Sequence, residues 1–427
     1  MRPKPCLYSL FFALFMLMPL FAMGAKQPTD EQLKALCRDA SFKLQEATSD
    51  EQRQQIFSTL TADFEKQADM SKVSVQQVDM MFEFGGITLA PYLSNWLAPV
   101  LSAKAEKEGG VYAFCAWKYM PRKDQFHQSE EEVMALKRFL DDASLQKVIE
   151  QQSEVARDVI NGISTFKNAN WLTQSFPESA AKFLKCSLPD VAVGECVKVF
   201  NSIVYADSVP AEVRDNIRQL VLGQYTKLAN STDNQRIKKN CNAQIEYLEG
   251  PFAKGTLVGE KAPQLHFVTV LHQQGDSICK VEISDLQSLF AKPEPPVVML
   301  DFWATKCVPC IQSFPEIAEV QEHFKDKNVI IFGITSLQGY FVDTPNHRTV
   351  QCRNNAEKEL GLFPAYMKSM GINWHIGVTE EDVMNTDYGA LAIPHIVLID
   401  KQGRVRYNAL SADKEEKIKL IESLLVE

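Results

Sequence analysis

The pattern of apolar and polar positions changes about halfway along the chain. From Asp30 to about Tyr247, apolar residues recur every three or four positions, which is the period of an amphipathic helix. Capping residues such as Ser49 precede several of these stretches. Almost no segment here alternates like a half-buried strand. The pattern therefore predicts an all-α domain over residues 26–250.

After residue 250, short apolar runs typical of buried strands are separated by helical stretches. One run starts at Val297 and another at Val329, with helical spacing between them. Because parallel strands need a crossover, this order predicts a parallel β-α-β unit. Further expected elements are a leading hairpin within residues 264–283, a long insert at 336–390 with one or two helices, strands at 393–400 and 404–409, and a closing helix at 413–426. Residues 251–427 are thus predicted to form an α/β domain of a multidomain chain.

Two cysteines, Cys307 and Cys310, follow the run that starts at Val297. If a helix begins at Cys307, backbone N–H groups and the positive end of the helix dipole point at its sulfur and stabilise a thiolate. Cys310 is then placed to attack a mixed disulfide on Cys307. A zinc site would need a second pair of ligands, and the sequence offers only isolated candidates. The pair predicts a redox-active disulfide that needs no metal or other cofactor.

The residues around this pair resemble a known fold family. Asp-Phe-Trp-Ala at 301–304, followed by Cys-x-Pro-Cys and a later Ile-Pro at 393–394, is similar to the thioredoxin fold. The Val-Pro dipeptide between the cysteines, the length of the downstream insert and the N-terminal segment resemble the TlpA/ResA-type envelope thioredoxins. The resemblance covers about residues 255–427 and leaves out the helical half.

The resemblance implies a role for each site residue. Cys307 is the nucleophile, and Cys310 is the resolving thiol. Asp301 is a buried carboxyl group that exchanges protons with Cys310, since burial raises the pKa of a carboxyl group towards neutrality. Pro394 follows a cis peptide bond. On the substrate side the resemblance places four residues: Ile393, Pro394, Trp303 and Lys306.

Two positions depart from the family pattern. Lys306 stands where a tryptophan is usual before the first cysteine, and it either lowers the pKa of the Cys307 thiol or extends into solvent. Ser313 occupies the place of a glutamate that is common after the second cysteine. Any role of that carboxylate in tuning the redox potential is therefore not expected here.

Charge and the first residues bear on partners and location. The formal net charge of −9 argues against nucleic acid or an anionic membrane surface as a partner. Residues 1–25 combine Arg2 and Lys4, an apolar stretch and then small residues, which predicts a signal peptide. We expect export to the periplasm or cell envelope, with an uncleaved anchor as the alternative.

The remaining cysteines fall into two groups. Cys186 and Cys196 flank a proline and a glycine, and a loop-closing disulfide between them is the predicted structural bridge. Most of the others are expected to be small buried apolar residues: Cys37, Cys115, Cys241, Cys279 and Cys352.

Two functions from different classes follow. The first is an envelope thiol–disulfide oxidoreductase acting on protein clients, which the resemblance implies to be a reductase supplied by a membrane-embedded electron donor. The second is a binding or chaperone-like module, in which the helical domain recognises a partner and the thioredoxin-like domain is a scaffold. Replacement of Cys307 by serine separates the two, because only the first function needs this thiol.

Overall fold

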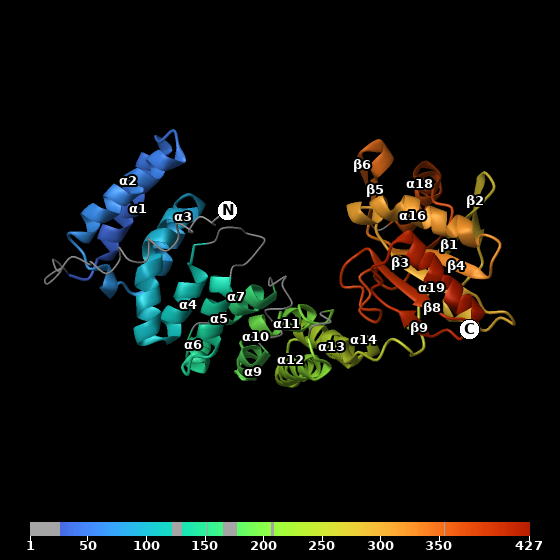
Figure 1. The fold of residues 1–427 in the computed structure, drawn as a ribbon, viewed down its shortest axis with the longest axis horizontal. Coiled ribbons are helices and arrows are strands. Elements are labelled where there is room, and N and C mark those ends of the chain that lie inside the picture. The colour runs from blue at the N-terminus through green and yellow to red at the C-terminus, as the bar shows by residue number, and fades with distance from the viewer. Residues whose placement is uncertain (1–25, 122–129, 152, 165–176, 206–208, 354) are drawn as a thin grey trace, which may run out of the picture. The chain divides into compact units, whose positions relative to one another are not determined.

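The computed structural model describes residues 26–121, 130–151, 153–164, 177–205, 209–353 and 355–427. The predicted signal peptide at residues 1–25 lies outside these ranges. The chain divides into two compact units, residues 1–224 and 225–427 (Figure 1). The boundary falls inside helix α12 (Ala211–Ser231), so the last helices before the sheet belong to the second unit.

The described part of the first unit is built from helices, which confirms the all-α prediction. Its α-helices are α1 (Asp30–Gln45), α2 (Asp50–Glu65), α3 (Val75–Glu108), α4 (Gly110–Lys118), α5 (Glu130–Leu140), α6 (Leu145–Gln151), α7 (Ser153–Ser164), α9 (Pro177–Lys185), α10 (Asp190–Val193), α11 (Val197–Asn201) and the start of α12. The side chain of Ser49 caps α2 by accepting a hydrogen bond from the N–H of Gln52 at 3.2 Å. Within the described ranges, no helix is both long and apolar enough to cross a membrane.

The second unit contains a seven-stranded sheet with the order β2-β1-β7-β4-β3-β8-β9. Strands β3, β4 and β7 are parallel neighbours, and the other pairs are antiparallel. The strands are β1 (Phe267–Gln274), β2 (Ser277–Val281), β3 (Val297–Phe302), β4 (Val329–Ser336), β7 (His375–Thr379), β8 (His395–Ile399) and β9 (Val405–Tyr407). The predicted leading hairpin is β1–β2, and the predicted β-α-β unit is β3–α16–β4.

Helices cover the sheet and fix the face on which the site lies. The helices of this unit are α13 (Gln235–Glu249), α14 (Pro251–Lys254), α15 (Gln287–Phe290), α16 (Val308–Phe324), α17 (Ala356–Leu360), α18 (Phe363–Met370) and α19 (Lys414–Val426). Side chains alternate along β3, so Met299, Asp301 and Trp303 share one face. Met299 and Trp303 belong to a core that also contains Phe314 of α16 and Leu424 of α19. Asp301 therefore lies between the sheet and these two helices.

The insert between β4 and β8 holds more strand than the sequence predicts. Besides α17 and α18 it contains a hairpin, β5 (Tyr340–Asp343) with β6 (Arg348–Gln351), and the sheet strand β7. Strand β7 has only five residues, so no apolar period stands out in its sequence. Its strand state depends on pairing with β4 and β1 on either side, which local propensity does not reveal.

Candidate active site

The cysteine pair lies where β3 gives way to α16. Cys307 is the N-cap of α16, and its Sγ accepts a hydrogen bond from the N–H of Cys310 at 3.2 Å. The two sulfurs form a disulfide with an S–S distance of 2.00 Å. Cys307 is 8% exposed and Cys310 is fully buried, whereas Val308 between them is largely exposed. Solvent therefore reaches a small part of Cys307 and none of Cys310.

Asp301 is buried on the face of β3 that α16 covers. It is 1% exposed, and neither carboxylate oxygen has a hydrogen-bond partner. Burial raises the pKa of Asp301 to about 7, which confirms the predicted direction. A carboxyl group with this pKa gains and loses a proton at neutral pH.

Two charged side chains act on Asp301 from the helices above it. Lys417 of α19 is itself buried, pairs with Glu316 of α16 and also donates to the backbone carbonyl of Ala412. The positive charge of Lys417 lowers the pKa of Asp301, and the negative charge of Glu316 raises it. The two members of the ion pair therefore shift the pKa of the buried carboxyl group in opposite directions.

The Ile393–Pro394 peptide bond is cis, as predicted, and lies beside the cysteines. The backbone carbonyl oxygen of Ile393 is 3.7 Å from Sγ of Cys307. Ile393 is half-buried and Pro394 is exposed. An extended peptide approaching Cys307 would thus meet this backbone edge.

Trp303 does not belong to the accessible part of the site, and the expectation that it contacts a substrate is wrong. The side chain is fully buried. Its ring meets the ring of Phe314 edge-on at 5.1 Å between centroids and stacks on Tyr366 at 6.1 Å. The alternation along β3 points Trp303 into the same core as Met299, so it supports the site from below.

Lys306 is exposed next to Cys307 and extends towards the β5–β6 hairpin. Its Nζ lies 5.5 Å from the centroid of the Tyr340 ring. The preceding Thr305 accepts a hydrogen bond from the N–H of Val342 at 3.1 Å. The hairpin is therefore fastened to the loop that carries the cysteines, a neighbour that the sequence did not indicate.

The predicted structural disulfide between Cys186 and Cys196 is not formed. Cys186 is a buried free thiol at the end of α9, and its Sγ lies 3.5 Å from the carbonyl oxygen of Lys182 in the preceding turn. The thiol thus turns back onto its own helix instead of across the loop. Spacing along the sequence does not reveal this direction.

The fold and the site together define a thioredoxin-like oxidoreductase domain. Residues 259–425 match the Redoxin family, so the C-terminal part of this chain contains a Redoxin domain. The match does not extend into the helical region.

Two of three similar proteins, ResA and YneN, carry names of the same class. ResA, a thiol-disulfide oxidoreductase from Bacillus subtilis, is 26% identical over 126 residues, which cover 30% of this chain and 55% of ResA. DipZ from Mycobacterium tuberculosis is 28% identical over 123 residues, covering 29% of this chain and 15% of DipZ. The thioredoxin-like protein YneN from Bacillus subtilis is 24% identical over 153 residues, covering 36% of this chain and 71% of YneN. This chain thus spans about half of ResA and a small part of DipZ.

A solved structure gives a similar coverage. The thioredoxin domain of a thiol-disulfide oxidoreductase from Bacteroides vulgatus aligns over 39% of this chain and 97% of that domain, with 19% identity and a TM-score of 0.27.

Proposed function

We propose that this chain catalyses dithiol–disulfide exchange with protein clients through Cys307 and Cys310. The observation that carries the proposal is the pairing of these cysteines at the N-terminus of α16, with Cys307 8% exposed and Cys310 fully enclosed. Unpaired N–H groups and the helix dipole favour the Cys307 thiolate over the thiol. The thiolate is the attacking species in disulfide exchange.

The reaction runs in two displacements when the pair starts reduced. The Cys307 thiolate attacks a client disulfide, forms a mixed disulfide and releases one client thiolate. Asp301 takes the proton of the Cys310 thiol, whose thiolate then attacks Sγ of Cys307 and releases the second client thiolate. The proton passes to a departing thiolate, so the client gains two electrons and the Cys307–Cys310 disulfide remains.

The client is held at the backbone edge beside Cys307. The carbonyl of Ile393 and the cis bond at Pro394 present an edge to which an extended client segment adds by backbone hydrogen bonds. Lys306 is exposed next to Cys307 and near Tyr340, where it contacts residues that flank the client disulfide.

We further propose that the protein works in the cell envelope as a reductase. Export rests on the signal-like composition of residues 1–25. Each turnover leaves Cys307 and Cys310 oxidised, so a reductase needs an electron donor, which we place in the membrane. The name of ResA, a thiol-disulfide oxidoreductase, supports the exchange chemistry.

The redox equilibrium of the cysteine pair tests this function. The full chain would be equilibrated with series of dithiothreitol and of glutathione, and the fraction of the Cys307–Cys310 disulfide measured. A potential near that of thioredoxin, about −270 mV, supports a reductase, and one near about −120 mV identifies an oxidant. The absence of reversible exchange would overturn the proposal. In parallel, Cys310→Ser should accumulate mixed disulfides with the client.

The alternative is a binding module in which the helical unit does the work. That unit exposes apolar side chains, including Phe42 and Ile87, which a partner could cover. The serine variant Cys307→Ser discriminates between the two, because a binding module keeps its biological role without the thiol. We favour exchange because the cysteine pair and the buried Asp301 have no use in a scaffold.

A further inference from the structure

The loop between β7 and β8, residues 380–394, links the candidate active site to a distant part of the chain. At its end lies the cis bond beside Cys307. Along its length it contacts residues 251–266, which lead from α14 to β1 and are called the connector here. The first half of the connector, residues 251–258, precedes the Redoxin match, which starts at Gly259.

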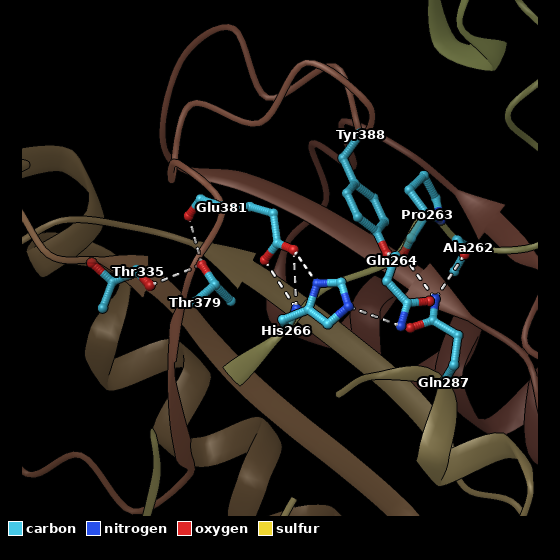
Figure 2. Close-up of polar contacts among 9 residues, drawn as sticks. All are labelled: Ala262, Pro263, Gln264, His266, Gln287, Thr335, Thr379, Glu381 and Tyr388. Carbon is cyan, nitrogen blue, oxygen red and sulfur yellow. Dashed lines mark hydrogen bonds and ion pairs between the residues drawn. The ribbon is translucent and has the colours of Figure 1, made fainter. Parts of the chain in front are cut away.

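Three contacts that involve side chains fasten the connector to this loop, besides a backbone hydrogen bond from the N–H of Glu380 to the carbonyl oxygen of His266 at 2.9 Å. The hydroxyl of Tyr388 donates to the carbonyl oxygen of Pro263 at 2.6 Å. Nδ1 of His266 lies 2.6 Å from a carboxylate oxygen of Glu381, and the same carboxylate accepts the backbone N–H of His266 (Figure 2). In Figure 2, the side chain of Tyr388 reaches Pro263 of the connector and that of Glu381 reaches His266. The third contact is apolar and is made by a residue of α14.

The apolar contact joins Phe252 of α14 to Gly389. A Cβ built on Gly389 would lie 2.2 Å from the Phe252 ring, so only glycine allows this approach. The φ angle of Gly389 is 70°, which glycine also adopts without strain. Gly389 therefore gives the loop the backbone conformation that lets Phe252 of the connector come this close.

From Tyr388 the contacts continue to the cis proline. The buried Tyr388 ring packs against Phe302 at the end of β3, with 5.4 Å between centroids. The backbone of Tyr388 accepts a hydrogen bond from the ring of His395, the residue after Pro394. That ring also contacts Phe302 edge-on at 5.9 Å, and its Nε2 lies 3.0 Å from Oδ1 of Asn408.

The His395 ring is thus held on three sides. Because His395 is covalently attached to Pro394, a fixed ring restricts where the preceding backbone can lie. The carbonyl of Ile393, 3.7 Å from Sγ of Cys307, is the end of this chain of contacts. The position of this carbonyl decides how close the disulfide of a bound client comes to Sγ of Cys307. Small displacements of reacting atoms lower the reaction rate.

We propose that Tyr388 and His395 are positioning residues that join the connector to the Ile393–Pro394 edge and so hold the backbone of a client beside Cys307. This inference rests on the proposed disulfide exchange. Neither residue touches the reacting sulfurs. Their effect is therefore confined to substrates that possess a peptide backbone.

The experiment compares two disulfides on the reduced full-length chain. One is a short peptide cyclised by a single disulfide, which can pair with Ile393, and the other is hydroxyethyl disulfide, which has no backbone. Tyr388→Phe removes one hydroxyl, and His395→Leu removes the ring hydrogen bonds while keeping an apolar side chain. Single-turnover oxidation of the cysteine pair is followed against substrate concentration, which separates apparent affinity from the limiting rate.

We expect the second-order rate constant for the peptide to fall about tenfold in each variant, which corresponds to roughly the loss of one hydrogen bond. The fall should lie in apparent affinity, and the rate with hydroxyethyl disulfide should change less than about twofold. The matched control is Tyr407→Phe, on a half-buried tyrosine of β9, which should leave both rates unchanged.

Two results would overturn the inference. Equal losses with both disulfides would place the effect on the cysteine chemistry or on folding, and unchanged rates with the peptide would show that the contacts are not needed. Failure of the unmodified chain to react with either disulfide would instead contradict the proposed function. The three outcomes are therefore distinguishable in one set of measurements.

Discussion

Asp301 shows how a single buried group can serve chemistry at the expense of stability. Its two oxygens have no hydrogen-bond partner, and burial raises its pKa to about 7. The folded chain therefore retains a proton that the unfolded chain releases above its ordinary pKa of about 3.9. Stability linked to this group is complete below that value and is lost as the pH rises towards 7.

We predict that Asp301→Asn is more stable than the unmodified chain at pH 7. The variant removes the ionisation that favours unfolding, while its unpartnered buried amide offsets part of the gain, so we expect about 2 kcal/mol. Urea denaturation at pH 7 and pH 4 measures the difference, which should shrink at pH 4. Asp326→Asn, at an exposed aspartate, is the control. A gain in stability over the unmodified chain that is no larger at pH 7 than at pH 4 would contradict this account.

Helices α16 and α19 tune this carboxyl group from above. Lys417 and Glu316 form an ion pair between the two helices, and their charges act on the pKa of Asp301 with opposite signs. Lys417 is buried, so its charge is poorly screened by solvent. The packing of α16 against α19 thus places two opposing charges where they act on the pKa of Asp301 on β3.

We predict opposite shifts from the two members of this pair. Lys417→Met should raise the pKa of Asp301, and Glu316→Gln should lower it, because each removes one of the two opposing charges. The pH dependence of the resolving step would report the shifts. Lys414→Met is the matched control on α19, since its ion pair with Glu319 is more exposed. Shifts of the same sign would exclude this arrangement of charges.

Strands β1 and β7 bring two histidines face to face. The rings of His272 and His375 stack with 4.0 Å between centroids and 9° between planes. Burial, together with the neighbouring His272, lowers the pKa of His375 to about 3. The folded chain therefore keeps His375 neutral at pH values where the unfolded chain binds a proton. Stability from this group is complete above about pH 6.5 and is lost as the pH falls towards 3.

We predict that His375→Phe loses less stability on acidification. A phenyl ring keeps the contacts with His272 and Phe332 but cannot bind a proton. Between pH 6.5 and pH 5 the unmodified chain should lose about 2 kcal/mol more than the variant. Thermal or urea denaturation at both pH values measures this, with His347→Asn as the control at an exposed histidine. Parallel pH profiles for His375→Phe and the unmodified chain would refute the prediction.

At the scale of the whole molecule, the second compact unit extends beyond the Redoxin match. The unit starts at Tyr225 and the match at Gly259. Phe252 lies in the added part, where it is buried against Gly389. The segment before the Redoxin domain is therefore part of the folded unit.

We predict that a fragment of residues 225–427 is more stable than one of residues 259–427. The shorter fragment lacks the ring of Phe252, and the loss of a buried phenylalanine costs about 3 kcal/mol. Urea denaturation of both fragments measures this, and Phe252→Ala in the longer fragment should reproduce most of the difference. Equal midpoints for the two fragments would show that the connector contributes no stability.

The sequence predicted those parts of the fold that depend on short stretches of neighbouring residues. Helix caps such as Ser49, the apolar run of β3 and the spacing of Cys307 and Cys310 depend on neighbouring residues. The cis bond at Ile393–Pro394 and the raised pKa of Asp301 followed from the resemblance and from burial. Both predictions were based on short motifs in the sequence.

Several features depended on which segments the fold brings together. Trp303 was expected at the surface but lies in the core, because the register of β3 aligns it with Met299 and Asp301. The thiol of Cys186 faces its own helix, and five-residue β7 exists through its neighbours in the sheet. No local pattern indicates that Tyr388 and His395 form a link to the cis proline.

The sequence by itself therefore determined the class of each half and the position of the cysteine pair, because periodicity and spacing act over a few residues. The tertiary structure decided which side chains surround them. The ion pair over Asp301, the hairpin at Lys306 and the connector against Gly389 join residues far apart along the chain. Such contacts arise from packing and strand register, which no local pattern encodes.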